Sequence, residues 1–358
     1  MKIAVDRTNY KYIKNDGNEY IYVFDNEKLS NLLKTNLHCI DYRFIDSVDI
    51  NTTQYDIRCK KKASINEDFN ALFKKRDYKI GIIVPNYNYE HTIEKCLTSI
   101  LNQTYQNFEI IFVDDCSTDN SIDVAQTTYL KYCAKELHKF NVDSEWAELP
   151  KNFKLVRLQQ KRYNGGARNE AYLHLSEDVD YVYYVDSDDW LYNENALKDI
   201  NEALVGEPDV LFVGLAKCRN QITTKENIPD YKDRYEAMQG WSGSCGKVIK
   251  KELATKQECL YNEGTLKEDK NQHCRICIYM NDFKCLDKLI YVWNQDNRKS
   301  VTTIREKVFW GTSTIRHYAD TIQLALSVEG KDARIDAILK ERINKCAEEV
   351  KNGNDRQY

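Results

Sequence analysis

The sequence predicts an α/β fold built on a mostly parallel, Rossmann-like sheet with helices on both faces. Between 79 and 214, short runs rich in Val, Ile, Phe and Tyr alternate with segments of helical periodicity. The runs are nearly continuous in apolar residues, as expected for strands that are covered on both faces. Strands that alternate with helical crossovers form parallel sheets, and such sheets bind ligands beyond the carboxyl ends of their strands.

Five runs are the predicted strands: KIGIIV (79–84), FEIIFV (108–113), KLVRL (154–158), YVYYV (181–185) and DVLFVG (209–214). A helix is predicted over 91–103, because four apolar residues fall on one stripe at helical spacing. These are Ile93, Leu97, Ile100 and Leu101. A second helix is predicted over 120–140, between the second and third strands.

Three parts of the chain are predicted. Residues 1–77 form a small α/β accessory segment with strands over 19–24 and 38–50 and a helix over 26–36. Residues 78–304 form the main domain. Residues 305–358 form a helical extension, whose amphipathic stretch IDAILKERINKCAEEV indicates packing or oligomerisation, so a homo-oligomer stays open.

Composition limits the class of protein. The 358 residues carry a formal net charge of −4, which gives no basic field for a nucleic-acid partner. No apolar run approaches the roughly 20 residues that span a bilayer, and the first residues lack the apolar core of a signal peptide. We therefore expect a cytoplasmic protein, with peripheral membrane contact left open.

The twelve cysteines are scattered, and one group invites a zinc interpretation. This group is His273, Cys274, Cys277 and Cys285. Because no second CxxC pair exists, we favour buried, free thiols over a metal site.

Polar segments follow four of the predicted strands. They are PNYNYEH (85–91), DDCSTD (114–119), QQKRYNGGARN (159–169) and DSDDW (186–190). Because parallel strands end at one edge of a sheet, these segments are predicted to converge on one site.

The acidic turn 186–190 indicates a metal. Closely spaced carboxylates supply the oxygen ligands that Mg²⁺ or Mn²⁺ requires, and these ions commonly bridge a protein to a diphosphate. The alternative is a solvated turn. The position of the turn after a buried strand favours the metal.

Three further positions have a possible functional role, and each also has a structural alternative. Asp115 can accept a hydrogen bond from a nucleobase, whereas Ser117 or Asp119 of the same segment can cap a helix. Arg168 follows Gly165 and Gly166, which give the backbone freedom, and it can reach a diphosphate or stack against a base. The alternative is a tight turn into a helix, with Arg168 in a surface salt bridge. The pair Glu268–Asp269 can cap a helix or supply a general base.

The ordered set IIVPNYN, FVDDCSTD, NGGARN and YVDSDDW resembles glycosyltransferase family 2, which has the GT-A fold and uses nucleotide sugars. The segments WSGSCGKVIKKEL, NEGTLKED and YVWNQDNRKSVTT extend the resemblance, which covers about 79 to 303. A dinucleotide fingerprint and a P-loop are both absent.

The resemblance implies roles for residues of the matching motifs. Pro85, Tyr87 and Asp115 would hold the nucleobase, Arg168 and Arg298 would contact the donor, and Asp186 with Asp188 would form the metal-binding D-x-D. Asp269 would be the base, with Glu268 second, and Asp189 would assist or orient. On the acceptor side, Trp241 could stack on a sugar or anchor a loop, and Lys247 could neutralise phosphate or lie on the surface.

The implied function is an inverting glycosyltransferase of the hexosyltransferase type, with a UDP-sugar donor and Mn²⁺ or Mg²⁺. Its acceptor would be a hydroxyl of a glycan, a lipid-linked molecule or another compound. The processive signature Q-x-x-R-W is absent, which favours transfer of one sugar. Two alternatives are a non-catalytic binding module of the same fold and a nucleotidyltransferase, although IIVPNYNYEH (82–91) lacks the Gly-rich, basic signature of a nucleotidyltransferase.

Overall fold

The computed structural model describes residues 11–15, 20–24, 45–50, 55–59, 77–139, 152–296 and 307–355. Two compact units are present: Met1–Asp77 with Asn201–Pro208, and Tyr78–Ile200 with Asp209–Tyr358. The predicted boundary between 304 and 305 and the predicted helix over 26–36 lie outside the described residues.

The first unit contains an antiparallel sheet in its described part, in the order β1-β2-β4-β3. Its strands are β1 (Lys11–Asn15), β2 (Tyr20–Phe24), β3 (Ile45–Ile50) and β4 (Tyr55–Cys59). The predicted strands over 19–24 and 38–50 correspond to β2 and β3, whereas β1 and β4 were not predicted.

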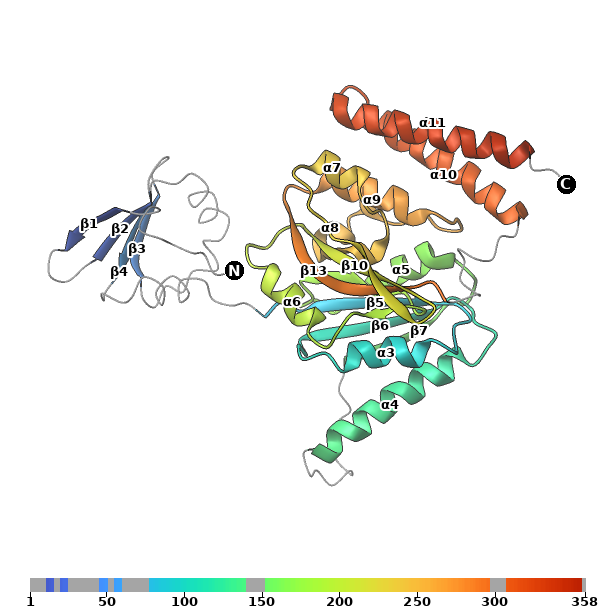
Figure 1. Ribbon diagram of the computed structural model, residues 1–358, viewed down its shortest axis with the longest axis horizontal. Coiled ribbons are helices and arrows are strands. Elements are labelled where there is room, and N and C mark those ends of the chain that lie inside the picture. The colour runs from blue at the N-terminus through green and yellow to red at the C-terminus, as the bar shows by residue number, and fades with distance from the viewer. Residues whose placement is uncertain are drawn as a thin grey trace. The chain divides into compact units, whose positions relative to one another are not determined.

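The second unit is built on the mixed sheet in Figure 1, whose described strands run in the order β7-β6-β5-β8-β12-β10-β13-β9, with β11 beside β10. The predicted strands are β5 (Ile80–Asn86), β6 (Phe108–Asp114), β7 (Phe153–Arg157), β8 (Tyr181–Tyr184) and β10 (Val210–Arg219). The first four pair in parallel, as predicted. The antiparallel strand β12 (Lys247–Lys250) separates β8 from β10.

The remaining strands of this sheet are β9 (Trp190–Leu191), β11 (Ile222–Asn227) and β13 (Phe283–Asn294). The long strand β13 pairs in parallel with β10 and antiparallel with β9. Because β9 directly follows the acidic turn, β13 lies beside that turn.

Helices cover both faces of the sheet (Figure 1). α3 (Ile93–Leu101) and α4 (Ser121–Lys139) lie on one face, and α5 (Tyr163–Leu173), α7 (Arg234–Gln239), α8 (Lys251–Ala254) and α9 (Glu268–Tyr279) lie on the other. The predicted stripe of α3 is buried, which explains the helix, because an amphipathic segment gains stability by burying its apolar face. α6 (Ala196–Ala203) completes the helices of 77–296.

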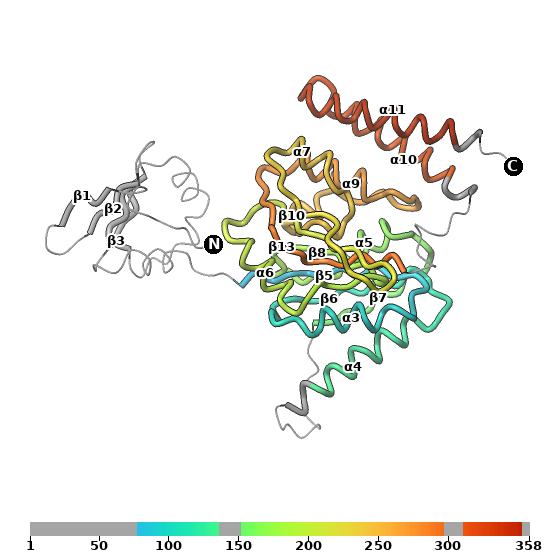
Figure 2. The backbone as a smooth tube through the Cα atoms, viewed as in Figure 1, coloured from blue at the N-terminus to red at the C-terminus, as the bar shows by residue number. Residues whose placement is uncertain are grey.

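The C-terminal helices α10 (Lys307–Val328) and α11 (Ala333–Asp355) run alongside α9 and α7, as Figures 1 and 2 show. Leu324, Ile338 and Leu339 belong to the same hydrophobic cluster as Ile83 of β5. The two helices therefore complete the core above the sheet. No helix in the described parts of the chain has both the length and the apolar character needed to cross a bilayer.

Candidate active site

The carboxyl ends of β5, β6, β7 and β8 lie side by side, so the polar segments that follow them meet at one edge of the sheet. At this edge the backbone N–H of Asp115 donates to the carbonyl of Asn86 (2.8 Å). This contact sets Asp115 beside Pro85, which is buried at the end of β5, and Tyr87, which is half-buried.

Asp115 fixes the start of α5. Its two carboxylate oxygens accept the backbone N–H groups of Arg162 (2.6 Å) and Tyr163 (2.7 Å). Burial raises the pKa of Asp115, although these hydrogen bonds oppose the shift. Lys161 lies just before them, and its Nζ is 3.1 Å from the centroid of the Tyr87 ring.

Asp119 lies at the start of α4, as the capping interpretation predicts. Its Oδ1 accepts the backbone N–H of Ser121 (3.0 Å), and its Oδ2 accepts that of Glu90 (3.1 Å). Asp115 and Asp119 thus have different partners, and of these two it is Asp115 whose carboxylate binds the start of α5.

The NGGARN segment lies within helix α5, which excludes the alternative of a tight turn that leads into a helix. Tyr163 takes the left-handed conformation (φ 59°), whereas the glycines follow within α5. A Cβ atom on Gly165 would lie 2.3 Å from the carbonyl oxygen of Asn262, and one on Gly166 would lie 2.2 Å from Cβ of Arg162. The glycines therefore permit close packing of α5.

Arg168 connects two acidic elements and makes no surface salt bridge, because its side chain is only 3% exposed. Its Nη2 donates to Oδ1 of Asp186 (2.7 Å), and its Nη1 donates to Oε1 of Glu268 (2.8 Å). Desolvation opposes its charge, but the two carboxylates outweigh it and hold the pKa of Arg168 well above the ordinary value. The guanidinium group thus joins the acidic turn to the start of α9.

The three aspartates of the acidic turn have different surroundings. The side chain of Asp186 is 31% exposed, and Asp188 is nearly buried. Asp189 is buried, and its oxygens accept the hydroxyl of Tyr291 (2.5 Å) and the backbone N–H of Asn294 (2.7 Å). Desolvation, with the neighbouring aspartates, raises the pKa of Asp189 well above its usual value. Asp189 therefore ties the turn to β13.

Residues that the sequence did not identify also support the turn. The Tyr291 hydroxyl accepts the backbone N–H of Asp186 (3.2 Å), and the hydroxyl of Thr92 donates to the carbonyl of Ser187 (2.9 Å). In the sequence, nothing distinguishes Tyr291 from the other residues of an apolar strand. These contacts depend on a sequence separation of about a hundred residues, so no local signal could have revealed them.

The arrangement suits a cation whose ligands come partly from the protein and partly from a substrate. Within the described residues, no group of three or more His, Cys, Asp or Glu side chains is placed to hold a metal. Asp189 is committed to protein donors, which leaves Asp186 and Asp188 as the candidate ligands. Mg²⁺ usually takes one or two carboxylates together with substrate phosphates, so two aspartates fit such a site.

The two acids that open α9 also differ. Glu268 is buried, and desolvation raises its pKa to about 7 against the opposing effect of Arg168. Asp269 is partly exposed, and its Oδ1 accepts the backbone N–H of Lys270 (2.9 Å). Glu268 is therefore held in an ion pair, whereas Asp269 is partly exposed at the start of the helix.

On the acceptor side, Lys247 is fully buried, which excludes the surface alternative for this residue. Its Nζ donates to the carbonyls of Ser242 (2.9 Å) and Gly243 (2.8 Å), and desolvation lowers its pKa to about 8. The ring of Trp241 packs edge-to-face on Trp293, with centroids 5.6 Å apart. Both residues hold the loop before β12.

Two other predictions concern Arg298 and the group of His273 with three cysteines. Arg298 lies in 297–306, outside the described residues. Cys274 and Cys277 are buried in the hydrophobic core, and Nε2 of His273 lies 2.9 Å from the carbonyl oxygen of Ala237. The interpretation of these cysteines as buried thiols is therefore confirmed.

Comparisons with known proteins agree with this fold. Residues 81–246 match the model of the family described as glycosyl transferase family 2. A 119-residue segment is 34% identical to the Escherichia coli UDP-Glc:alpha-D-GlcNAc-diphosphoundecaprenol beta-1,3-glucosyltransferase WfgD, covering 33% of this chain and 38% of the relative. A 160-residue segment is 32% identical to the Staphylococcus aureus poly(ribitol-phosphate) beta-N-acetylglucosaminyltransferase TarS, covering 42% of this chain and 24% of the relative.

A solved structure of residues 1–349 of S. aureus TarS, in complex with UDP-GlcNAc, has a TM-score of 0.56 at 19% identity, over 75% of this chain and 71% of that chain. This likeness shows the GT-A fold that the sequence predicts. The aligned segments span a minor part of many curated relatives, such as 16% of the Streptococcus pneumoniae glycosyltransferase GlyA.

Proposed function

Residues 81–246 form a glycosyl transferase family 2 domain, and from this premise we propose that the chain is an inverting, non-processive glycosyltransferase. It would move a sugar from a nucleotide-sugar donor to an acceptor hydroxyl. One observation carries the proposal. Asp186 of the acidic turn and Asp269 of α9 are both partly exposed, and the buried Arg168 joins these two elements through ion pairs to Asp186 and Glu268.

Asp269 is the general base of the proposed reaction. It accepts the proton of the acceptor hydroxyl while that oxygen attacks the anomeric carbon, and the nucleoside diphosphate leaves from the opposite face. Glu268 is less suited to this role, because its carboxylate is buried against Arg168. A base must reach the acceptor, and the partial exposure of Asp269 meets this requirement.

Asp188 and Asp186 would hold a divalent cation, Mn²⁺ or Mg²⁺. Such a cation supplies positive charge that offsets the charge developing on the leaving diphosphate. Asp189, through Tyr291 and Asn294, keeps the turn that carries both ligands in one conformation.

Pro85, Tyr87 and Asp115 would hold the nucleobase. Each oxygen of a carboxylate has two lone pairs, so Asp115 can accept an imide N–H in addition to its two backbone donors. A uracil base has such an N–H, and the TarS structures with UDP-GlcNAc and with UDP support a uridine donor.

The names of the relatives support two acceptor classes, a lipid-linked saccharide as for WfgD and a polyol-phosphate polymer as for TarS. Both offer a hydroxyl to a base.

A screen of nucleotide sugars tests this function. The protein is heated with UDP-, GDP- and ADP-sugars, each with and without Mn²⁺, and we expect only a UDP-sugar with Mn²⁺ to raise the melting temperature strongly. Release of UDP from that sugar, followed by mass spectrometry of acceptor mixtures, then separates an enzyme from a binding module. The proposal fails if no sugar nucleotide stabilises the protein.

A further inference from the structure

The contacts around Arg168 form a closed bridge between the donor side and the acceptor side of the site. Nη2 of the guanidinium group donates to Asp186 of the acidic turn (2.7 Å), and Nη1 donates to Glu268 of α9 (2.8 Å). Each of the two terminal nitrogens thus binds a carboxylate. Charge-assisted contacts of this kind fix geometry as well as charge.

The packing of α5 against α9 indicates that the bridge is a built feature. A Cβ atom on Gly165 would lie 3.2 Å from Cγ of Glu268 and 2.3 Å from the carbonyl oxygen of Asn262. A side chain at this position would collide with the backbone of Asn262 and crowd the side chain of Glu268. The glycine therefore lets α5 pack closely beside the residue that binds Arg168.

Tyr261 closes the third side of the bridge. Its ring centroid lies 5.2 Å from the guanidinium carbon of Arg168, and its hydroxyl donates to Oγ of Ser244 (2.8 Å). Arg168 has little freedom to change rotamer, because the Tyr261 ring lies beside its guanidinium group and both terminal nitrogens bind carboxylates.

We infer that Glu268 is a positioning residue for the donor side: it holds Arg168, and Arg168 holds the carboxylate of Asp186 in place for the cation and diphosphate. This inference rests on the proposed function. It gives the two acids at the start of α9 separate tasks, since Asp269 serves the acceptor and Glu268 acts on the donor through Arg168.

The assignment has a consequence that a catalytic base would not have. If Glu268 acts through Arg168 and Asp186, its loss weakens cation binding even when no acceptor is present. If Glu268 were the base, its loss would stop transfer and leave cation and nucleotide binding unchanged.

The experiment measures the binding of Mn²⁺ in the presence of UDP, by the loss of the electron paramagnetic resonance signal of free Mn²⁺. For Glu268→Gln we expect the half-saturating Mn²⁺ concentration to rise about tenfold, the size of one charge-assisted contact. Glu170→Gln is the matched control, because Glu170 lies on the same helix as Arg168 but pairs with Arg162, the residue before that helix (2.7 Å). It should bind Mn²⁺ as the wild type does.

A double-mutant cycle tests whether the effect passes through Arg168. Arg168→Met alone should weaken Mn²⁺ binding, and the double variant Arg168→Met/Glu268→Gln should be no weaker than Arg168→Met. The double variant also removes both buried charges together, which keeps the fold testable if a single variant unfolds.

Each outcome decides the matter. Provided that the wild type binds UDP, either of two results overturns the inference. The first is an unchanged half-saturating Mn²⁺ concentration in Glu268→Gln. The second is a double variant in which the effects of the two substitutions multiply. Failure of the wild type to bind UDP with Mn²⁺ overturns the uridine donor of the proposed function, and with it the donor-side task of Glu268.

Discussion

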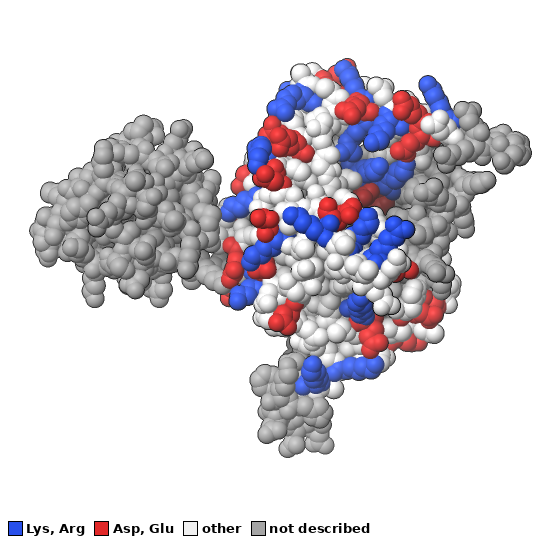
Figure 3. Space-filling view, in the orientation of Figure 1, with Lys and Arg blue, Asp and Glu red and all other residues white. Residues whose placement is uncertain are grey.

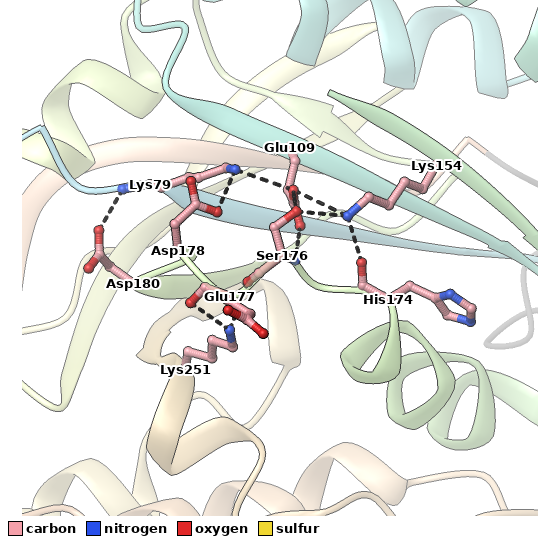
Figure 4. Close-up of polar contacts among 9 residues, drawn as sticks. All are labelled: Lys79, Glu109, Lys154, His174, Ser176, Glu177, Asp178, Asp180 and Lys251. Atoms are coloured by element: carbon pink, nitrogen blue, oxygen red, sulfur yellow. Dashed lines mark hydrogen bonds and ion pairs between the residues drawn. The ribbon is translucent and has the colours of Figure 1, made fainter. Parts of the chain in front are cut away.

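Buried acids at the two ends of the same parallel strands have pKa values shifted in opposite directions. At the amino end, Glu109 of β6 lies in the polar cluster of Figure 4. It accepts the backbone N–H (2.7 Å) and hydroxyl (2.5 Å) of Ser176 and pairs with Lys154 (3.4 Å) and Lys79 (3.5 Å). These partners overcome desolvation and lower the pKa of Glu109.

At the carboxyl end, desolvation prevails for two acids. The pKa of Asp189 lies well above its usual value, and that of Glu268 is raised to about 7. Perturbed acids cluster where a protein has a functional site, because the surroundings are arranged for a ligand as well as for the fold. Under the proposed function, the carboxyl end of the sheet is therefore the reactive end, and the amino end serves the fold.

The largest effect is expected at the reactive end, from Asp269→Asn. The amide cannot take the acceptor proton, so kcat should fall about a thousandfold, within the range for loss of a general base. Binding of UDP with Mn²⁺, measured by calorimetry, should stay at the wild-type value. Transfer at the wild-type rate by this variant would remove Asp269 from the base role.

Loss of the cation should have the next largest effect. EDTA and the substitution Asp188→Asn should each lower kcat/KM about a hundredfold, as expected for loss of one preorganised electrostatic contact. Titration with Mn²⁺ should restore the EDTA-treated wild type and restore Asp188→Asn only in part. Full activity in EDTA would contradict the metal assignment.

The structural end should respond in stability and not in catalysis. Glu109→Ala leaves Lys154 and Ser176 without their shared partner, so denaturant unfolding should show a loss of about 3 kcal/mol. The kcat/KM of the folded protein should be unchanged. Glu94→Ala, at an exposed pair with Lys131, is the control and should cost about 0.5 kcal/mol or less.

The smallest effect concerns the buried Lys247, whose pKa is lowered to about 8. Above pH 8 the folded state binds fewer protons than the unfolded state, so stability rises with pH until about 10.5, the ordinary pKa of lysine. Relative to Lys247→Met, the wild type should gain about 1 kcal/mol between pH 7 and pH 9. Equal pH dependence of the two proteins would contradict this assignment.

The sequence predicted what depends on local pattern. Continuous apolar runs identified β5, β6, β7 and β8 and their parallel pairing, and the stripe of α3 identified that helix. The antiparallel strand β12 was not predicted, because its four residues, KVIK, offer too short a pattern.

The sequence pointed to the acids of the candidate site and gave no sign of the residues that support them. Asp186 and Asp269 stand out as carboxylates after a strand and at a helix start, whereas Tyr291 acts through a contact 102 residues away from Asp189. The glycines of NGGARN illustrate the same limit. Their composition suggested a turn, but their function is to admit Asn262 and Glu268 close to α5, which only the tertiary structure reveals.

The C-terminal helices have a consequence for protein engineering. Because Leu324, Ile338 and Leu339 share one core with β5, a chimaera joined at 246, the end of the family match, would expose apolar surface on both of its halves. Lys267, next to Glu268, also pairs with Glu349 of α11. A graft that exchanges acceptor preference should therefore carry α9, α10 and α11 as one cassette.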